Sequence, residues 1–113
     1  MDTPSAPEPA NVEELLLKLK DTDEDVRIFA ALQLGSLGEY AQPSVPALIE
    51  LLGSQDVIER RVAALTLGQI GVAASEAVPL LVDALEDADE VVQQFAVAAL
   101  FKIEPDVGES DAA

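Results

Sequence analysis

Apolar residues recur along this chain with two superimposed periods. Over short distances they are three or four residues apart, which places them on one face of an α-helix. Over longer distances the whole pattern of apolar and polar residues returns after 33 residues. Three copies of the pattern can be aligned, at residues 12–44, 45–77 and 78–104. A fixed period of this length is typical of proteins that stack similar structural units.

Six positions hold the same residue in all three copies. They are Val12/Val45/Val78, Leu15/Leu48/Leu81, Leu19/Leu52/Leu85, Asp23/Asp56/Asp89, Ala30/Ala63/Ala96 and Leu34/Leu67/Leu100. All but the aspartate column are aliphatic, and alanine is small enough to let two helices approach closely. Half of all residues are hydrophobic, yet only 4% are aromatic. The core is therefore expected to consist of aliphatic side chains from closely packed helices.

Each copy is predicted to contain two antiparallel helices of unequal length. The first helix of the first copy is expected from about residue 12 to residue 20, after a capping box formed by Asn11 and Glu14. In the next two copies, Pro46 and Pro79 occupy the first turn of the corresponding helix. A proline is tolerated there because the missing amide hydrogen has no partner within the helix.

The second helix of each copy is expected to begin after the aspartate of the invariant column. This side chain can accept hydrogen bonds from the free amides of the first helical turn. In the second copy, Glu59 is expected to complete a capping box with Asp56. The second helices are predicted to end near Gly38, near Gly71 and before Pro105.

The chain is too short for a second domain. Neither helix of one copy can cover its apolar face alone, so three stacked pairs are expected to share one core. The predicted fold is all-α, a right-handed α-α superhelix (α-solenoid) of six helices spanning residues 11–104. Residues 1–10, which are rich in proline, are expected to be a disordered lead. Residues 105–113 are expected to form an acidic, mobile C-terminal tail.

Composition excludes several classes of chemistry. Cysteine and histidine are both absent, so the chain has no thiol nucleophile, no histidine base and no usual zinc or iron site. The acidic run Asp21–Asp25 does not match a calcium loop, because Val26 stands where such a loop needs glycine. We predict no catalytic residues, no cofactor and no metal.

The chain is strongly acidic, with 22 acidic and 6 basic residues and a formal net charge of −16. Such a surface repels the phosphates of nucleic acids and anionic membranes, so neither is an expected partner. No apolar run approaches the roughly 18 residues of a membrane span. Residues 1–10 do not have the pattern of a secretory signal. We expect a cytoplasmic protein.

The second copy resembles the bacterial and archaeal HEAT-like repeat, often called the phycobilisome-lyase HEAT-like repeat. The resemblance lies in the stretch 45–52, in the aspartate-bearing turn and in the stretch 60–71, and it extends over about residues 12–104. It implies a helical solenoid that serves as a scaffold. Enzymes built on related repeats include iron hydroxylases that need histidine and DNA glycosylases that need a basic groove. This chain has no histidine and is acidic, so it resembles neither enzyme. Bilin lyases have the same type of repeat but form longer arrays than this chain.

The expected function is a non-catalytic scaffold or adaptor that binds a protein or peptide. Two alternatives stay open. One is a phycobilisome or bilin-lyase-like accessory factor for pigment-protein maturation, and the other is a structural homo-oligomer that stacks through the ends of the solenoid. The protein is not expected to be an enzyme, because no converging pair of acidic residues is visible.

The candidate binding surface is the face of the second helices opposite their invariant columns. With about 100° of rotation per residue, this face lies away from the core, and in a solenoid of this type it lines the concave side. Aliphatic residues occupy its centre and basic residues border it, as in many protein-binding grooves. We term it the second-helix face. Its predicted partner-binding residues are Ile28, Leu32, Ile58, Arg61, Leu65, Gln69, Val91, Gln94 and Lys102.

Two further positions distinguish the copies. Arg27 and Arg60 are equivalent, and the resemblance implies that they belong to an inter-repeat ladder with turn aspartates; Gln93 takes this position in the last copy. Phe101 replaces the glycine of the other two copies. It is expected to seal the open C-terminal end of the core or, alternatively, to be a sticky end for self-association.

Overall fold

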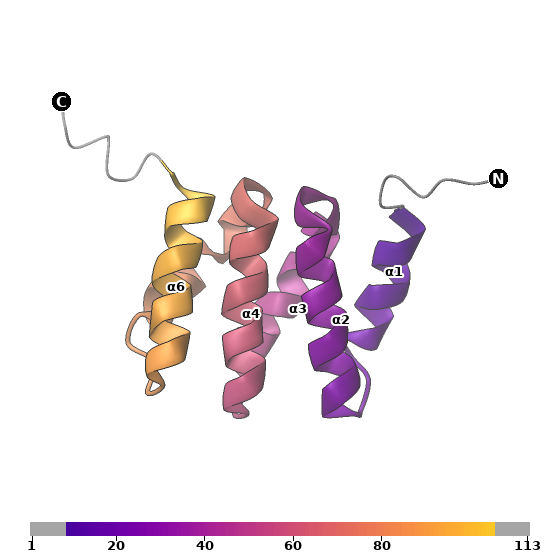
Figure 1. Ribbon diagram of the computed structural model, residues 1–113, viewed down its shortest axis with the longest axis horizontal. Coiled ribbons are helices and arrows are strands. Elements are labelled where there is room, and N and C mark those ends of the chain that lie inside the picture. Colours follow the sequence, from indigo (N-terminus) through magenta and orange to yellow (C-terminus); the bar gives the residue numbers. More distant parts are fainter. Residues whose placement is uncertain (1–8, 106–113) are drawn as a thin grey trace.

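The computed structural model of the protein describes residues 9–105 as a stack of helices (Figure 1). Within this range six α-helices and two 3-10 helices follow one another, and there is no β-strand. The predicted all-α fold is therefore confirmed. The predicted disordered lead and acidic tail lie outside the described residues, apart from residues 9, 10 and 105.

The helices form three pairs, and a 3-10 helix links each pair to the next. Their bounds are α1 Pro9–Lys18, α2 Glu24–Ser36, η1 Gly38–Ser44, α3 Val45–Leu52, α4 Val57–Ile70, η2 Gly71–Ala77, α5 Val78–Ala84 and α6 Glu90–Ile103. The sequence predicted that the second helices end near Gly38 and Gly71, and it did not predict the 3-10 helices η1 and η2 that follow them. It also placed the start of the first helix three residues too late, since α1 begins at Pro9 and Asn11 lies inside the helix instead of capping it.

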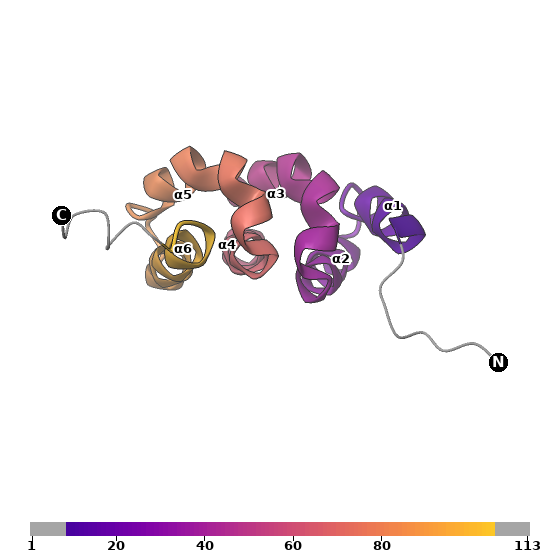
Figure 2. The ribbon, with the colours of Figure 1, turned by 90° about the horizontal axis from the view of Figure 1, so that it is seen from above.

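The helices are arranged in two layers. In Figure 1 the longer helices α2, α4 and α6 lie side by side, with α3 behind them. Figure 2 shows the stack from above, with α1, α3 and α5 on the outer side of a shallow arc and α2, α4 and α6 on its inner side. Helix α4 packs against both α2 and α6, so the three units follow one another in sequence order.

The predicted aspartate caps are confirmed in all three copies. Asp23 accepts a hydrogen bond from the Asp25 amide at 2.9 Å, and its backbone is extended as an N-cap requires. Asp56 accepts from the amides of Ile58 and Glu59 at 2.8 and 3.1 Å, and Asp89 caps α6 in the same way. The invariant aspartate column thus marks where each second helix begins.

The capping box predicted for Asp56 and Glu59 is wrong. The Glu59 carboxylate does not return to the Asp56 amide, which donates instead to Ser54 Oγ at 3.0 Å. Glu59 is buried and bonds outside its own helix. The other end of the second helix is as predicted, since Gly38 and Gly71 have φ of 60° and 80° and turn the chain out of α2 and α4.

The aliphatic columns form one core that runs through all three units. Leu34, Leu48, Leu67 and Leu81 are completely buried, as are the three alanines of the invariant column. These side chains come from both layers, so each unit contributes to a core that no single unit could close. The predicted shared aliphatic core is confirmed.

The stretch Val57–Ala84 is long and apolar enough, by length and composition alone, to cross a membrane, with a mean hydropathy of 1.5 over 18 residues. In the structure it is not one straight helix. The chain turns at Gly71, passes through η2 and continues as α5, and these elements pack within the stack. The pattern is therefore weak evidence for a membrane span.

Truncating Leu67 tests whether the stack depends on its central layer. Leu67→Ala leaves a cavity in the middle unit and is expected to lower the free energy of unfolding by about 2–5 kcal/mol. The matched control is Leu17→Ala, since Leu17 is exposed on α1. Urea unfolding followed by circular dichroism at 222 nm measures both variants, and equal stability of the two would contradict the shared core.

Candidate interaction surface

All nine residues predicted for the second-helix face lie on α2, α4 and α6, the helices on the inner side of the arc (Figure 2). Five of them are exposed: Leu32, Ile58, Gln69, Gln94 and Lys102. Four are partly buried: Ile28, Arg61, Leu65 and Val91. Leu32 and Ile58 are 42% and 41% exposed, although both side chains are purely aliphatic.

The 33-residue period aligns these side chains into rows. Because α2, α4 and α6 are equivalent and lie side by side, residues 33 positions apart lie at the same height on neighbouring helices. Leu32, Leu65 and Ala98 therefore form one aliphatic row across the three units, and Ile58 and Val91 belong to a second row nearer the helix N-termini. The face presents apolar groups from all three units.

Arg61 is not a free cation on this face. Its Nε and Nη2 donate to the two carboxylate oxygens of Asp89, both at 2.9 Å, and so join the second unit to the third. This hydrogen-bonded pair lowers the pKa of Asp89 from its usual 3.8 to about 2. Arg61 therefore contributes to the cohesion of the stack.

The equivalent contact between the first and second units has no such arginine–aspartate pair. Ile28 occupies the position of Arg61, so Asp56, the equivalent of Asp89, faces no arginine from this position. Glu24 lies beside Asp56, and a hydrogen bond to that carboxylate raises the pKa of Glu24 and lowers the pKa of Asp56. The two interfaces thus have unequal electrostatics despite the shared repeat.

The predicted ladder begins with a hydrogen bond inside each turn. Arg27 Nη1 donates to the Asp21 carbonyl at 2.7 Å and Arg60 Nη1 to the Ser54 carbonyl at 2.9 Å. Gln93, at the same position in the last copy, donates through Nε2 to the carbonyl of residue 87 at 2.6 Å. All three side chains close the turn before their own helix.

Only the arginines reach the following unit. Arg60 Nε and Nη2 donate to the two carboxylate oxygens of Asp87, at 2.9 and 3.1 Å, which confirms the predicted pairing with a turn aspartate. For Arg27 the prediction is wrong, because the turn position in the second copy is Ser54. Arg27 Nε donates at 2.7 Å to Glu59, a residue of α4. The carboxylate therefore comes from the helix in one interface and from the turn in the other.

Glu59 is buried because its two carboxylate oxygens are both satisfied. It is only 4% exposed, and Ser54 Oγ donates to its second oxygen at 2.7 Å. Valine takes the same position in the other copies, as Val26 and Val92. A lone glutamate in an otherwise apolar column was the sequence signal for this contact, since a buried carboxylate needs a charged partner.

Several exposed aromatic and aliphatic side chains were missed by the sequence analysis. Phe29 is 60% exposed, although an apolar residue stands at this position in all three copies. Its equivalents Val62 and Phe95 are partly buried. Phe29 lies in the first of the three described units, whereas Val62 and Phe95 lie in units that follow another described unit.

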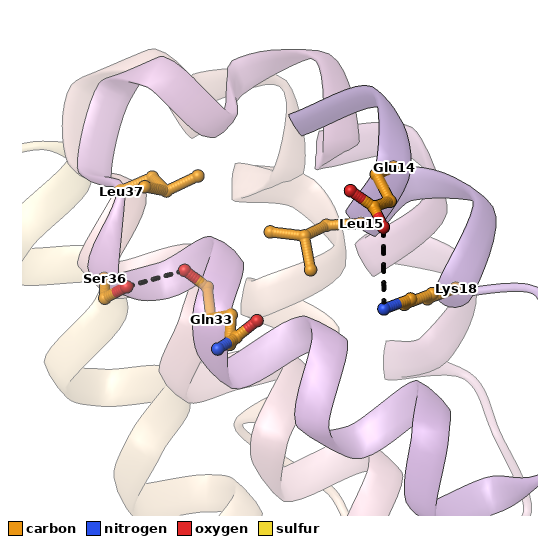
Figure 3. A pocket seen from close by; sticks show the side chains of 6 residues that line it. All are labelled: Glu14, Leu15, Lys18, Gln33, Ser36 and Leu37. Carbon is orange, nitrogen blue, oxygen red and sulfur yellow. Dashed lines mark hydrogen bonds and ion pairs between the residues drawn. The ribbon is translucent and has the colours of Figure 1, made fainter. Parts of the chain in front are cut away.

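A shallow depression of about 250 Å³ lies at the N-terminal end, between α1 and α2 (Figure 3). Its lining residues are Glu14, Leu15, Lys18, Gln33, Ser36 and Leu37. Polar groups in it bond one another, with Lys18 Nζ 3.9 Å from Glu14 and Ser36 Oγ donating to the Gln33 carbonyl at 2.7 Å. Among residues 9–105 no cluster of three or more acidic side chains is arranged to hold a metal ion.

Moving the carboxylate that binds Arg27 from position 59 to position 54 tests the first ion pair of the ladder. Glu59→Val removes the acceptor of Arg27 and is expected to lower the free energy of unfolding by about 1–3 kcal/mol. Adding Ser54→Asp recreates the arrangement of Asp87 and Val92 in the next interface, so the double variant is expected to regain most of the loss. Urea unfolding measures both variants. If the single and double variants were destabilised equally, an aspartate at position 54 would not replace Glu59 as the partner of Arg27.

Low pH tests the link between Arg61 and Asp89. Because the pKa of Asp89 falls from 3.8 to about 2 in the folded protein, its contribution to stability is complete above about pH 4 and is lost as the pH falls to 2. Asp89→Asn keeps a capping oxygen and removes the charge. Its melting temperature should therefore fall less than that of the wild type between pH 4 and pH 2. If the melting temperatures of the two proteins fell equally between pH 4 and pH 2, the Arg61–Asp89 pair would not be the cause of the pH dependence.

Comparison with known proteins agrees with the geometry. The family described as HEAT repeats matches residues 12–101, a range that includes parts of all three units. No curated protein sequence gives a significant match. HEAT repeats are generally protein-interaction scaffolds, and the family is typically non-enzymatic. With three stacked helical pairs and a match over most of its length, the chain belongs to the HEAT-repeat family.

Proposed function

We propose that the protein is a non-catalytic interaction module that binds a protein or peptide segment through its second-helix face. The observation that supports this most directly is the exposure of Leu32 and Ile58 on neighbouring helices on the inner side of the arc. Exposed aliphatic side chains that share one face favour an interaction site.

The stacking of units does not account for this exposure. The residues of α2 and α4 that contact the following unit, such as Ala31 and Ala64, are completely buried. Leu32 and Leu65 are their immediate neighbours in sequence and point away from that contact by about 100°. They therefore form a surface that the stack leaves uncovered.

The charges around the face indicate which partner it suits. Asp23 and Asp25 are exposed where α2 begins, and Glu90 is exposed where α6 begins. Toward the C-terminal ends of α2, α4 and α6 the face carries Ser36, Gln69 and Lys102, which are equivalent to one another. None of these three residues is acidic. A segment with aliphatic side chains in the middle and basic residues toward the acidic edge would complement this pattern.

The two alternative functions have less support. For a bilin-lyase-like factor, a depression of about 390 Å³ lined by Glu13, Leu16, Leu17 and Lys20 is shallow, whereas small-molecule sites usually enclose most of their ligand. A homo-oligomer requires that the two ends of the stack fit each other. At the C-terminal end Val97 and Phe101 are exposed, but at the N-terminal end Gln33 stands where Thr66 and Ala99 contact the preceding unit, so the two ends are not matched.

Binding through the second-helix face can be tested with paired variants. The double variant Leu32→Asp/Ile58→Asp places two charges in the aliphatic rows. It is expected to weaken the binding of a captured partner at least about tenfold. Both side chains are exposed, so the fold should persist, which circular dichroism checks. The matched control is Val72→Asp, since Val72 is an exposed aliphatic residue on η2, outside the face.

Titration of the purified partner against the three proteins decides the outcome. The proposal requires that the control binds like the wild type and that the double variant does not. If a folded double variant binds as tightly as the control, the second-helix face is not the binding surface.

A further inference from the structure

The second-helix face offers a ligand aliphatic side chains from each of its three helices. Leu32, Leu65 and Ala98 form one row across α2, α4 and α6, and Ile58 and Val91 form the row nearer the helix N-termini. Leu32, Ile58 and Ala98 are exposed. None of the nine residues predicted for this face is aromatic. The kind of ligand that suits it is therefore limited.

Polar side chains beside these rows are engaged within the protein. Ser36 Oγ donates to a backbone carbonyl of its own helix at 2.7 Å, and Arg61 Nε and Nη2 donate to the carboxylate of Asp89. The side chain of Gln69 covers Gly35, since a Cβ atom added to that glycine would overlap Gln69 Oε1. On α2 and α4 these groups are therefore not arranged to bind the backbone of a ligand.

An extended segment would gain little from such a surface. Recognition of a strand relies on main-chain hydrogen bonds to the edge of a sheet, and recognition of a polyproline segment relies on grooves lined by aromatic residues. Residues 9–105 contain no strand, and the second-helix face has no aromatic side chain. Above Leu32, Leu65 and Ala98 the backbone N–H and C=O groups of an extended segment would find no partner in the protein.

An α-helix suits the same surface better, because it satisfies its own backbone groups. The spacing of its apolar residues also fits. Packed helices lie about 8–10 Å apart, and seven residues of a helix rise by about 10.5 Å. A ligand helix that crosses α2, α4 and α6 would therefore place its residues i, i+7 and i+14 over Leu32, Leu65 and Ala98.

The charges at the two edges of the face distinguish the two flanks of such a helix. Asp25 and Glu90 are exposed where α2 and α6 begin, at one edge. Lys102 is exposed near the end of α6, at the opposite edge. A complementary helix would carry lysine or arginine along the flank beside Asp25 and Glu90, and no basic residue beside Lys102.

We propose that the second-helix face binds an amphipathic α-helix of about 15–18 residues, with apolar residues seven positions apart and basic residues along one flank. This inference rests on the proposed function, and it adds the conformation and the charge pattern of the partner. A segment with the same side chains that cannot form a helix should bind much more weakly.

Two synthetic peptides test whether the ligand must be helical. The first has about 18 residues, with leucine at i, i+7 and i+14, lysine along one flank and a single tryptophan. The second differs only in two outward-facing residues, which are replaced by proline to prevent a helix. Both peptides have the same charge, so the general attraction to an acidic protein is equal. The protein contains no tryptophan, so the fluorescence of the peptide reports binding.

The helical peptide is expected to bind the wild type at least about tenfold more tightly than the proline peptide and to gain ellipticity at 222 nm. It should lose this affinity for Leu32→Asp/Ile58→Asp and keep it for Val72→Asp. The double variant is more acidic than the wild type, so a merely electrostatic attraction would become stronger in it. Circular dichroism checks that each variant is folded.

A matched pair of variants tests the basic flank. Asp25→Asn/Glu90→Gln removes two charges from the edge of the face, whereas Glu39→Gln/Glu76→Gln removes two exposed charges from η1 and η2. The first pair is expected to weaken the helical peptide several-fold more than the second. Equal affinities for the two would show that the flank is not recognised.

Failure of this inference can be distinguished from failure of the proposed function. The helical requirement is overturned if the proline peptide binds the wild type as tightly as the helical one, or if the helical peptide does not bind the wild type. The proposed function stands in both cases if a captured partner still loses binding to Leu32→Asp/Ile58→Asp. If the helical peptide binds this variant as tightly as Val72→Asp, the peptide does not lie on the second-helix face and the inference is wrong.

Discussion

The stack depends on how closely successive second helices approach one another. At Gly68 an added Cβ atom would lie 3.0 Å from Ala99 Cα, so even a methyl group would require the backbone of α6 to move by a few tenths of an ångström. In the preceding interface Thr66 Oγ1 donates to the Ala31 carbonyl at 3.2 Å, so side chain and backbone of two units are in direct contact there as well. Such short separations exclude water and allow the leucines on either side to be completely buried.

Charged side chains connect the same units at the edge of this apolar contact. Each arginine of the ladder binds the carbonyl of its own turn and a carboxylate of the next unit, so it holds a turn and an interface together. The carboxylate reaches it from α4 in one interface and from a turn in the other. A repeat protein can therefore exchange the source of a charge between two sites that meet in space, provided that the pair remains complete.

The division of helix surfaces explains which residues remain available for a partner. One side of α4 contacts α2 of the preceding unit, another contacts α6 of the following unit, and a third packs against α3. The side left over faces the inner side of the arc, and aliphatic residues there have no contact to bury them completely. Within the described residues α2 and α6 each pack against only one other second helix, and Phe29 and Phe101 on these helices are more exposed than their equivalents Val62 and Gly68 on α4.

The sequence by itself determined the repeat unit, because the spacing of leucine and alanine columns reports directly on which side of a helix is buried. The aspartate caps and the glycines that end α2 and α4 were equally predictable, since each acts within a few residues of its own position. Tertiary structure alone decided the partner of Arg27, the use of Arg61 in an inter-unit pair and the exposure of Phe29 and Phe101. These features depend on contacts between units that are far apart in the sequence, and the distance between neighbouring helices cannot be derived from any local sequence pattern.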